Sequence, residues 1–209
     1  MPEIKKYKMF IDGEWVHSES RKTFQSLNPE NNEPWAEVPE ADEKDVDRAV
    51  NAAQKAFEGT WSKLFPRERA KYLKAIAEQL RENAELLGKI ETIDTGKLFK
   101  ETKTQANYIA EYYDYYAGLA DKVEGTVLPI DKPNMQVITT RVPIGVVAAI
   151  IPWNSQMLLT AVKLAPALAM GNAVVIKSSE LAPATLFEFA KLIEKVGIPR
   201  GVVNIVSGF

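Results

Sequence analysis

The sequence predicts an α/β protein whose last third, residues 143–209, forms a parallel β-sheet with βαβαβ topology. Three short apolar runs, GVVAAII, AVVIK and GVVNIV, lack the polar alternation of half-exposed strands. Segments of helical length separate the runs, over residues 155–169 and 183–196. Gly171 and Gly197 follow these segments as stop signals. Apolar strands joined by helices are typical of a parallel sheet covered on both faces.

The amino-terminal part begins with a β-hairpin and continues with helices. Alternating apolar residues flank Asp12-Gly13 in YKMFIDGEWV, a strong hairpin signal. A helix is expected from Asp42, because acidic residues in a first turn suit the helix dipole. Its predicted apolar stripe consists of Val46, Ala49, Val50, Ala53 and Phe57. Helical spacing then predicts a helix or helix pair over residues 67–95, ended by Gly96, and a tyrosine-rich helix over residues 104–120.

The segment between the helices and the parallel sheet changes character. GTVLPIDKPNMQVITTR is β-branched and alternating, and it is broken by Asp131 and Pro133. We expect a two-stranded excursion over residues 125–141. The predicted organisation is therefore residues 1–122, with the hairpin and helices, residues 123–142, with the excursion, and residues 143–209, with the sheet.

Composition excludes several function classes. The chain has 209 residues, a net charge of -2, one histidine (His17) and no cysteine. Basic and acidic residues are interleaved, so neither nucleic acid nor an acidic membrane is an expected partner. The lack of a signal sequence or a long apolar run predicts a cytoplasmic protein. Cysteine and histidine counts exclude disulfides, a thiol nucleophile, a histidine-based triad and a multi-histidine metal site in this chain.

Polar residues follow the three predicted strands, where ligands bind in parallel sheets. Asn154 follows the first strand and could donate to a developing oxyanion, or it could cap the next helix. Lys177 and Glu180 follow the second strand and could converge on the hydroxyls of a ribose, or form a surface salt bridge. Lys163 could be a buried amine near the chemistry or a side chain that extends to solvent. No GxGxxG or Walker pattern follows any strand.

Several segments together resemble the aldehyde dehydrogenase superfamily. PWN, K-x-x-P-A-L-A-x-G-N and K-x-S-E occur within residues 143–209 at the spacings of its coenzyme-binding stretch. FIDGEWV, NPENNEPWAEVPEADEKDVDRAV and ETIDTGK resemble its amino-terminal segments, in their order along the chain. The resemblance covers nearly the whole chain. It implies a Rossmann-like sheet, an arm over residues 123–142 through which these enzymes form dimers or tetramers, and a small aldehyde as substrate.

The resemblance also implies roles for individual residues. Asn154 would hold the substrate carbonyl oxygen, and Lys163 matches a lysine that some members use in proton relay. The coenzyme-binding positions would be Ile151, Pro152, Trp153, Lys177, Ser179, Glu180 and Gly208. A carboxylate at Glu180 favours NAD over NADP, because it would repel a 2′-phosphate. Asp94 matches a position that helps to hold a structural monovalent cation in some members, although a hydrogen bond at the C-terminal end of its helix would also explain it.

The chain departs from the family in three places. Ser178 replaces a common proline, which we expect to change loop rigidity more than contacts. Ser155 and Gln156 replace the aromatic-proline pair usual after the asparagine, so the familiar members do not indicate which aldehyde is used. The family mechanism also needs a cysteine nucleophile and a glutamate base. The chain lacks the cysteine and is expected to be truncated relative to the family, without the catalytic cysteine and glutamate.

Three hypotheses follow from this sequence. The chain could be the amino-terminal part of an NAD-dependent aldehyde dehydrogenase, inactive by itself. It could be a non-catalytic module that binds nucleotide weakly or associates with full-length subunits. It could also be an unrelated α/β protein in which the marked residues are caps and salt bridges. The first two predict an unpaired apolar edge on the third strand of the sheet, residues 201–206, and hence an aggregation-prone chain.

Overall fold

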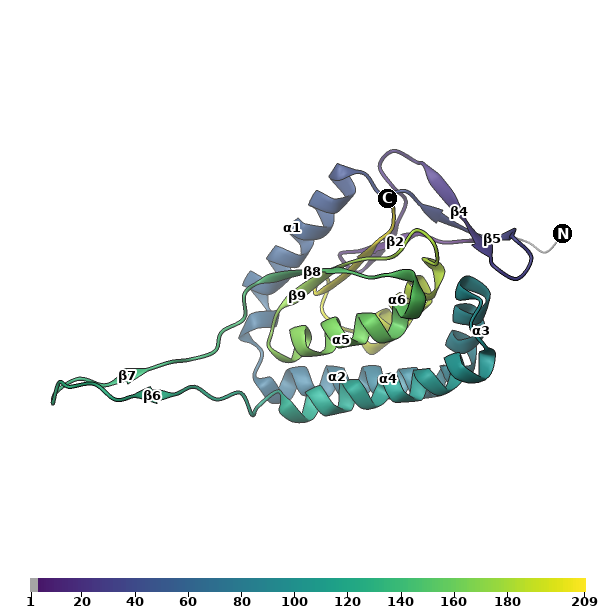
Figure 1. The fold of residues 1–209 in the computed structure, drawn as a ribbon. Coiled ribbons are helices and arrows are strands. Elements are labelled where there is room, and N and C mark those ends of the chain that lie inside the picture. Colours follow the sequence, from purple (N-terminus) through teal and green to yellow (C-terminus); the bar gives the residue numbers. More distant parts are fainter. Residues whose placement is uncertain (1–3) are drawn as a thin grey trace.

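The computed structural model describes residues 4–209, and the main sheet of this part is mixed (Figure 1). Its strand order is β3-β2-β10-β9-β8. The strands are β2 (Met9–Ile11), β3 (Glu14–Val16), β8 (Val146–Ile150), β9 (Ala173–Lys177) and β10 (Val203–Val206). β8, β9 and β10 are parallel, whereas β2 and β3 form an antiparallel hairpin. The predicted α/β class, the βαβαβ sheet and the hairpin are confirmed.

The hairpin occupies the edge that was predicted to be unpaired. Asp12 and Gly13 have φ angles of 55° and 70°, the left-handed conformation that a tight hairpin turn requires. β2 pairs with β10, Phe10 opposite Ile205. The expectation of an open edge on β10 is therefore wrong. The edge strands of this sheet are β3 and β8, and Ile150 of β8 is 72% exposed.

The helices form layers on both faces of the main sheet (Figure 1). They are α1 (Glu43–Gly59), α2 (Pro66–Glu82), α3 (Ala84–Thr95), α4 (Phe99–Leu119), α5 (Gln156–Ala169) and α6 (Ala184–Val196), with short 3-10 turns η1 (Trp61–Lys63) and η2 (Trp153–Ser155). α1 packs on one face of the sheet, and α5 and α6 pack on the other. α2, α3 and α4 form an outer layer against α5 and α6. The main hydrophobic core lies between these layers.

The start of α1 is fixed by a pair of aspartates. The Asp42 carboxylate accepts the amide of Asp45, and the Asp45 carboxylate accepts the amide of Asp42. Asp45 also accepts the Ser18 hydroxyl at 2.8 Å and is buried. This contact sets the rotation of the helix. The predicted stripe was therefore partly wrong, because Val46 and Val50 are 42% and 41% exposed.

A second sheet was not predicted. It has the order β1-β5-β4, with β1 (Lys5–Lys6), β4 (Thr23–Asn28) and β5 (Glu33–Pro39). β4 and β5 are antiparallel, with an irregularity between Ser26 and Leu27. Ser26 faces inward at this point and is 1% exposed. The irregularity interrupts the period-2 pattern from which a strand would be recognised.

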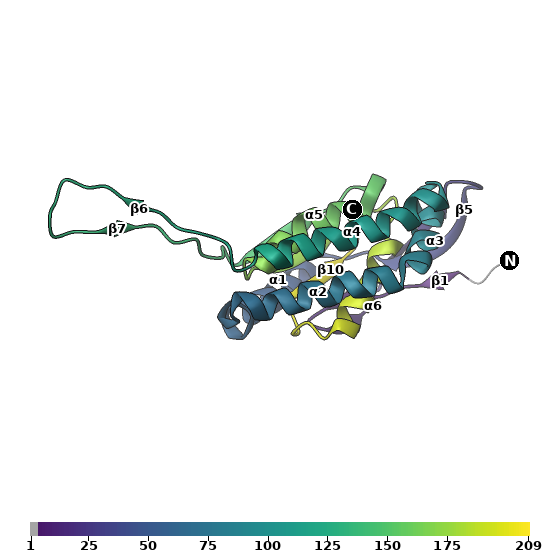
Figure 2. The ribbon, with the colours of Figure 1, turned by 90° about the horizontal axis from the view of Figure 1, so that it is seen from below.

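The predicted excursion is a two-stranded hairpin, β6 (Val127–Leu128) and β7 (Val137–Ile138), which extends away from the body (Figures 1 and 2). We call residues 123–142 the arm. Its large apolar residues are exposed, among them Val127 at 66% and Ile138 at 62%. Its role in assembly and the boundaries 1–122, 123–142 and 143–209 remain predictions. No helix among residues 4–209 has the length and apolar character needed to cross a membrane.

Candidate functional site

The carboxyl ends of β8, β9 and β10 are level with one another. Ile150 and Val206 both pair with Lys177, from opposite sides of β9. Beyond the strands the backbones stay joined, because the Ile151 amide donates to the Lys177 carbonyl and the Ser178 amide donates to the Val206 carbonyl. We call residues 151–154, 177–180 and 207–208 the strand-end surface. The structure thus brings together the coenzyme-binding residues predicted from three separate segments.

Asn154 lies in η2, directly after β8. The N-cap of the following helix α5 is Ser155, and the N-cap of η2 is Pro152; neither end has a side-chain capping bond. The capping alternative for Asn154 is therefore wrong. Its side chain is exposed, next to Trp153 at 50% exposure, whereas Ile151 is buried. The exposed side-chain amide of Asn154 can therefore donate a hydrogen bond to a bound ligand.

Lys177 and Glu180 converge, as both interpretations of the pair require. The Lys177 ammonium lies 3.0 Å from the Glu180 carboxylate, and the two side chains are 30% and 37% exposed. A backbone hydrogen bond within Glu180 and the bond from Lys177 hold the pKa of the Glu180 carboxyl below its usual value. The charged pair therefore offers a donor and an acceptor side by side, the combination that vicinal hydroxyls can bind.

Ser178 makes contacts that the family's proline could not make. It is fully buried, and both its amide (2.9 Å) and its hydroxyl (3.3 Å) donate to the Val206 carbonyl. These contacts were not expected, and the expected effect on loop rigidity stays a prediction. Ser179 accepts the Leu181 amide at 3.2 Å. Gly208 has φ 149°, and a Cβ there would lie 3.3 Å from the Ala41 backbone.

Two lysines have different environments near this surface. Lys163 is half-buried and makes only a long contact of 3.4 Å to the Leu159 carbonyl, so its proposed relay role remains a prediction. Lys97, which the sequence reasoning did not select, hydrogen-bonds the Ser155 hydroxyl next to Asn154. Its ammonium also lies 4.0 Å from Glu91. The ETIDTGK segment contains Lys97, but its sequence does not indicate that the loop after α3 reaches η2.

Asp94 links three segments in the interior. One carboxylate oxygen accepts the Ser26 hydroxyl at 2.7 Å, and the other accepts the amides of Ala184 and Thr185 at 2.8 and 3.3 Å. These amides open α6, so Asp94 caps a helix distant in sequence. We call Asp94 with these three partners the Asp94 junction. The expected hydrogen bond at the C-terminal end of its own helix is therefore wrong, because Asp94 instead accepts amides at the start of α6. The cation-binding role remains a prediction.

Burial controls ionisation in α3. Desolvation raises the pKa of Asp94 to about 6, against the lowering effect of its hydrogen bonds. The Trp35 indole also lowers the pKa of Asp94, although its Nε1 has no partner within hydrogen-bond geometry among residues 4–209. Desolvation raises the pKa of Glu91 to about 7, and the Lys97 charge only partly opposes this. Two buried carboxyls one turn apart therefore titrate near neutrality.

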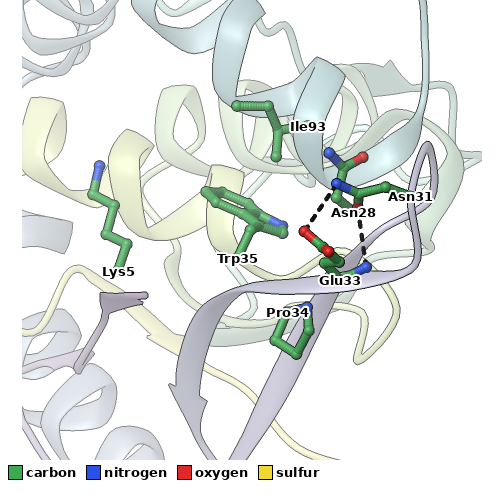
Figure 3. A pocket seen from close by; sticks show the side chains of 7 residues that line it. All are labelled: Lys5, Asn28, Asn31, Glu33, Pro34, Trp35 and Ile93. Carbon is green, nitrogen blue, oxygen red and sulfur yellow. Dashed lines mark hydrogen bonds between the residues drawn. The ribbon is translucent and has the colours of Figure 1, made fainter. Parts of the chain in front are cut away.

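A cavity of about 360 Å³ is lined in part by Ile93, the neighbour of Asp94 in sequence, and by no residue of the strand-end surface (Figure 3). Its wall includes Trp35 and Ile93, with Lys5 on one side and Asn28 and Glu33 on the other. None of the predicted site residues lines it. The polar groups that line the cavity in the turn between β4 and β5 bond one another. The Glu33 amide, for example, donates to the Asn31 side chain at 3.0 Å. This cavity therefore does not replace the strand-end surface as the candidate site.

Comparison with known proteins identifies relatives of this chain in sequence and in fold. The chain is 50% identical over 207 residues to (Z)-2-((N-methylformamido)methylene)-5-hydroxybutyrolactone dehydrogenase of Acinetobacter baylyi, covering 99% of this chain and 42% of that protein. It is 43% identical over 201 residues to betaine aldehyde dehydrogenase of Bacillus subtilis, covering 96% of this chain and 41% of that protein. The chain thus spans about two fifths of the length of these relatives.

Solved structures that are similar to this chain are also aldehyde dehydrogenases. Betaine aldehyde dehydrogenase of Staphylococcus aureus in complex with NAD+ matches with a TM-score of 0.93 and 39% identity, over 97% of this chain and 40% of that one. Aldehyde dehydrogenase of Bacillus cereus, E194S mutant, matches with a TM-score of 0.95 and 39% identity, over 98% and 42%. The family model described as "Aldehyde dehydrogenase family" matches residues 15–209. The hypothesis of an unrelated α/β protein is therefore wrong, and the chain belongs to the aldehyde dehydrogenase family.

Proposed function

We propose that this chain supplies the coenzyme-binding surface and the amide oxyanion donor of an NAD-dependent dehydrogenase that oxidises an aldehyde to a carboxylic acid. The observation that supports the proposal is the level alignment of three strand ends, because the segments that carry Asn154 and the Lys177–Glu180 pair leave the sheet at the same edge. Exposed polar groups at this edge of a parallel sheet form the usual ligand crevice.

The residues present fit NAD. The Lys177 ammonium and the Glu180 carboxylate are about one third exposed and can separate to bind the two hydroxyls of the adenosine ribose. A 2′-phosphate would face the Glu180 carboxylate, so NADP fits less well. When bound, NAD accepts a hydride. Trp153, half exposed next to Asn154, offers apolar surface along the coenzyme.

Asn154 would act on the substrate. Its Nδ2 hydrogens would donate to the aldehyde oxygen as negative charge develops there, which lowers the barrier to nucleophilic attack. The chain has no cysteine, so the thiolate nucleophile of the family mechanism must come from polypeptide other than these 209 residues. We accordingly propose that this chain alone does not turn over aldehydes.

The arm favours a second candidate function. Its exposed apolar residues resemble an interface without its partner. A role in assembly would not require the cysteine nucleophile that this chain lacks. The chain would then associate with full-length family members, or with a second copy of itself, through the arm. A stoichiometric mixed oligomer would distinguish this function from that of a catalytic part.

Native mass spectrometry followed by an NAD reduction assay on the same sample tests both functions. The assay uses a panel of aldehydes. A species of 23.3 kDa that binds NAD but gives no NADH supports a coenzyme-binding part that lacks its nucleophile. A larger assembly that forms NADH with a partner chain supports the full dehydrogenase reaction. Failure of every species to bind NAD would contradict the first proposal.

A further inference from the structure

A cavity of about 230 Å³ lies at the root of the arm, where the arm leaves the body and returns to it. Arg69 reaches it from α2, Asp121 from the segment after α4, and Arg141 from the returning side of the arm. Met170, after α5, also lines it. The root lies at the end of the body from which the arm projects in Figures 1 and 2. No residue of the strand-end surface lines this cavity.

Arg69 is a buried cation held by neutral groups. Arg69 as a whole residue is only 8% exposed. Its Nε donates to the Ala169 carbonyl at 3.0 Å, and its Nη1 donates to the Leu64 carbonyl. The guanidinium lies against Gly171, where a Cβ would be 3.4 Å from Cζ. Burial lowers the pKa of Arg69, because desolvation penalises the charged form.

No carboxylate neutralises this charge in the described part of the chain. Among residues 4–209, no Asp or Glu oxygen lies within ion-pairing distance of Arg69 or Arg141. Asp121, the acidic residue of the cavity, pairs with Lys122 instead. Burying a cation without a counter-ion is costly, and a bound anion would offset that cost.

We propose that an oxyanion, either a phosphate group or a carboxylate, binds in this cavity between Arg69 and Arg141. The planar guanidinium presents paired N–H donors that match the oxygens of both anions. Since a water molecule occupies about 30 Å³ in the liquid, a cavity of about 230 Å³ holds a small oxyanion together with several waters. Arg141 belongs to the arm and Arg69 to the body, so the bound anion would also tie the arm to the body.

Equilibrium dialysis of the 209-residue chain with inorganic phosphate, at constant ionic strength, tests the proposal without depending on an unfolding transition. We expect saturable binding at one site. Arg141→Gln should weaken it by about tenfold, as expected for loss of one charge-assisted partner. Arg141 is exposed and makes no ion pair among residues 4–209, so this variant should fold. Lys74→Gln, which removes an exposed cation on the same helix as Arg69 but outside the cavity, is the matched control and should bind phosphate normally.

A short peptide with a free terminal carboxylate, compared with the same peptide amidated, identifies the source of the anion. Binding of the acid but not the amide would assign the site to a polypeptide carboxylate. Binding of phosphate without the peptide would assign it to free phosphate, and either result supports the oxyanion site. Absence of saturable binding for both anions, or equal binding by Arg141→Gln, would overturn the proposal.

Discussion

Asp94 and Asn154 were both selected from sequence as functional polar residues, and the structure places them in opposite circumstances. At the Asp94 junction the carboxylate is 2% exposed and both oxygens accept hydrogen bonds from the protein. At the strand-end surface the Asn154 amide is exposed and caps neither adjoining helix. A polar side chain whose bonds are already made supports the fold, whereas one without internal partners is available to a ligand.

The largest expected effect is the loss of stability on removing the Asp94 carboxylate. Asp94→Ala should lower the free energy of unfolding by about 3–5 kcal/mol, because it leaves buried donors of Ser26 and α6 unpaired. Urea denaturation measures this. Asp94→Asn, which keeps an acceptor, should cost less than half as much. Equal stability of Asp94→Ala and the parent chain would contradict the structural role of the Asp94 carboxylate.

The pH dependence of stability should reveal the buried carboxyls of α3. The pKa of Glu91 is about 7 in the folded chain and that of Asp94 about 6, both above their ordinary values of 4.5 and 3.8. Between these limits the folded state binds more protons than the unfolded state, so stability falls as pH rises from about 4 to 7. At 1.36 kcal/mol per pKa unit, Glu91 alone accounts for a loss of up to about 3 kcal/mol.

Glu91→Gln isolates that contribution. The neutral amide should remove about half of the decline, because Asp94 contributes the rest, so the variant should be more stable than the parent at pH 8 and similar to it at pH 4. Urea midpoints across this range measure the difference. Glu78→Gln, at an exposed position on α2 that forms no ion pair among residues 4–209, is the control and should leave the slope unchanged. An equally steep decline in Glu91→Gln and in the parent would contradict the contribution of Glu91.

A substitution at the strand-end surface should lower the affinity for the coenzyme and leave the free energy of unfolding unchanged. Glu180→Gln removes the charge that pairs with Lys177 and the proposed acceptor for a ribose hydroxyl. We expect NAD affinity to fall about tenfold, equivalent to 1.4 kcal/mol, in a calorimetric titration. Discrimination against NADP should fall as well, because the repelling charge is gone. Glu194→Gln, on α6 but outside this surface, should bind NAD as the parent does.

The smallest expected effect concerns Asn154 itself. Asn154→Ala should change the free energy of unfolding by less than about 0.5 kcal/mol, the range of surface substitutions away from caps and buried networks. Chemical denaturation alongside Asp94→Ala provides the direct contrast. A destabilisation above about 1 kcal/mol would mean that the amide has a structural partner after all.

Local patterns predicted the elements that depend on neighbouring residues. Asp12-Gly13 fixed the hairpin turn, and the apolar runs and glycine stops predicted β8 to β10 with their helices, all of which the structure contains. Contacts between distant segments were not predictable in this way. The pairing of β2 with β10 was missed, because no periodicity indicates which strand lies beside which.

The same limit applied to the site. Strand ends gather at one edge of a parallel sheet, so the grouping of Asn154, Lys177 and Glu180 follows from topology and could be predicted. The capping of α6 by Asp94 and the reach of Lys97 to Ser155 depend on how α3 packs. Residue types alone could not distinguish these structural contacts from ligand-binding groups.

The pairing of Phe10 with Ile205 has a consequence for how the chain acquires its structure. During synthesis β2 and β3 emerge first, yet their partner β10 is made nearly two hundred residues later. Until then the side of β2 away from β3 has no partner strand, and Phe10, buried in the main core of the finished fold, lacks Ile205 beside it. Such distant pairings slow folding, since a long loop must close before the contact forms. The nascent hairpin is therefore the segment on which we expect chaperones to act.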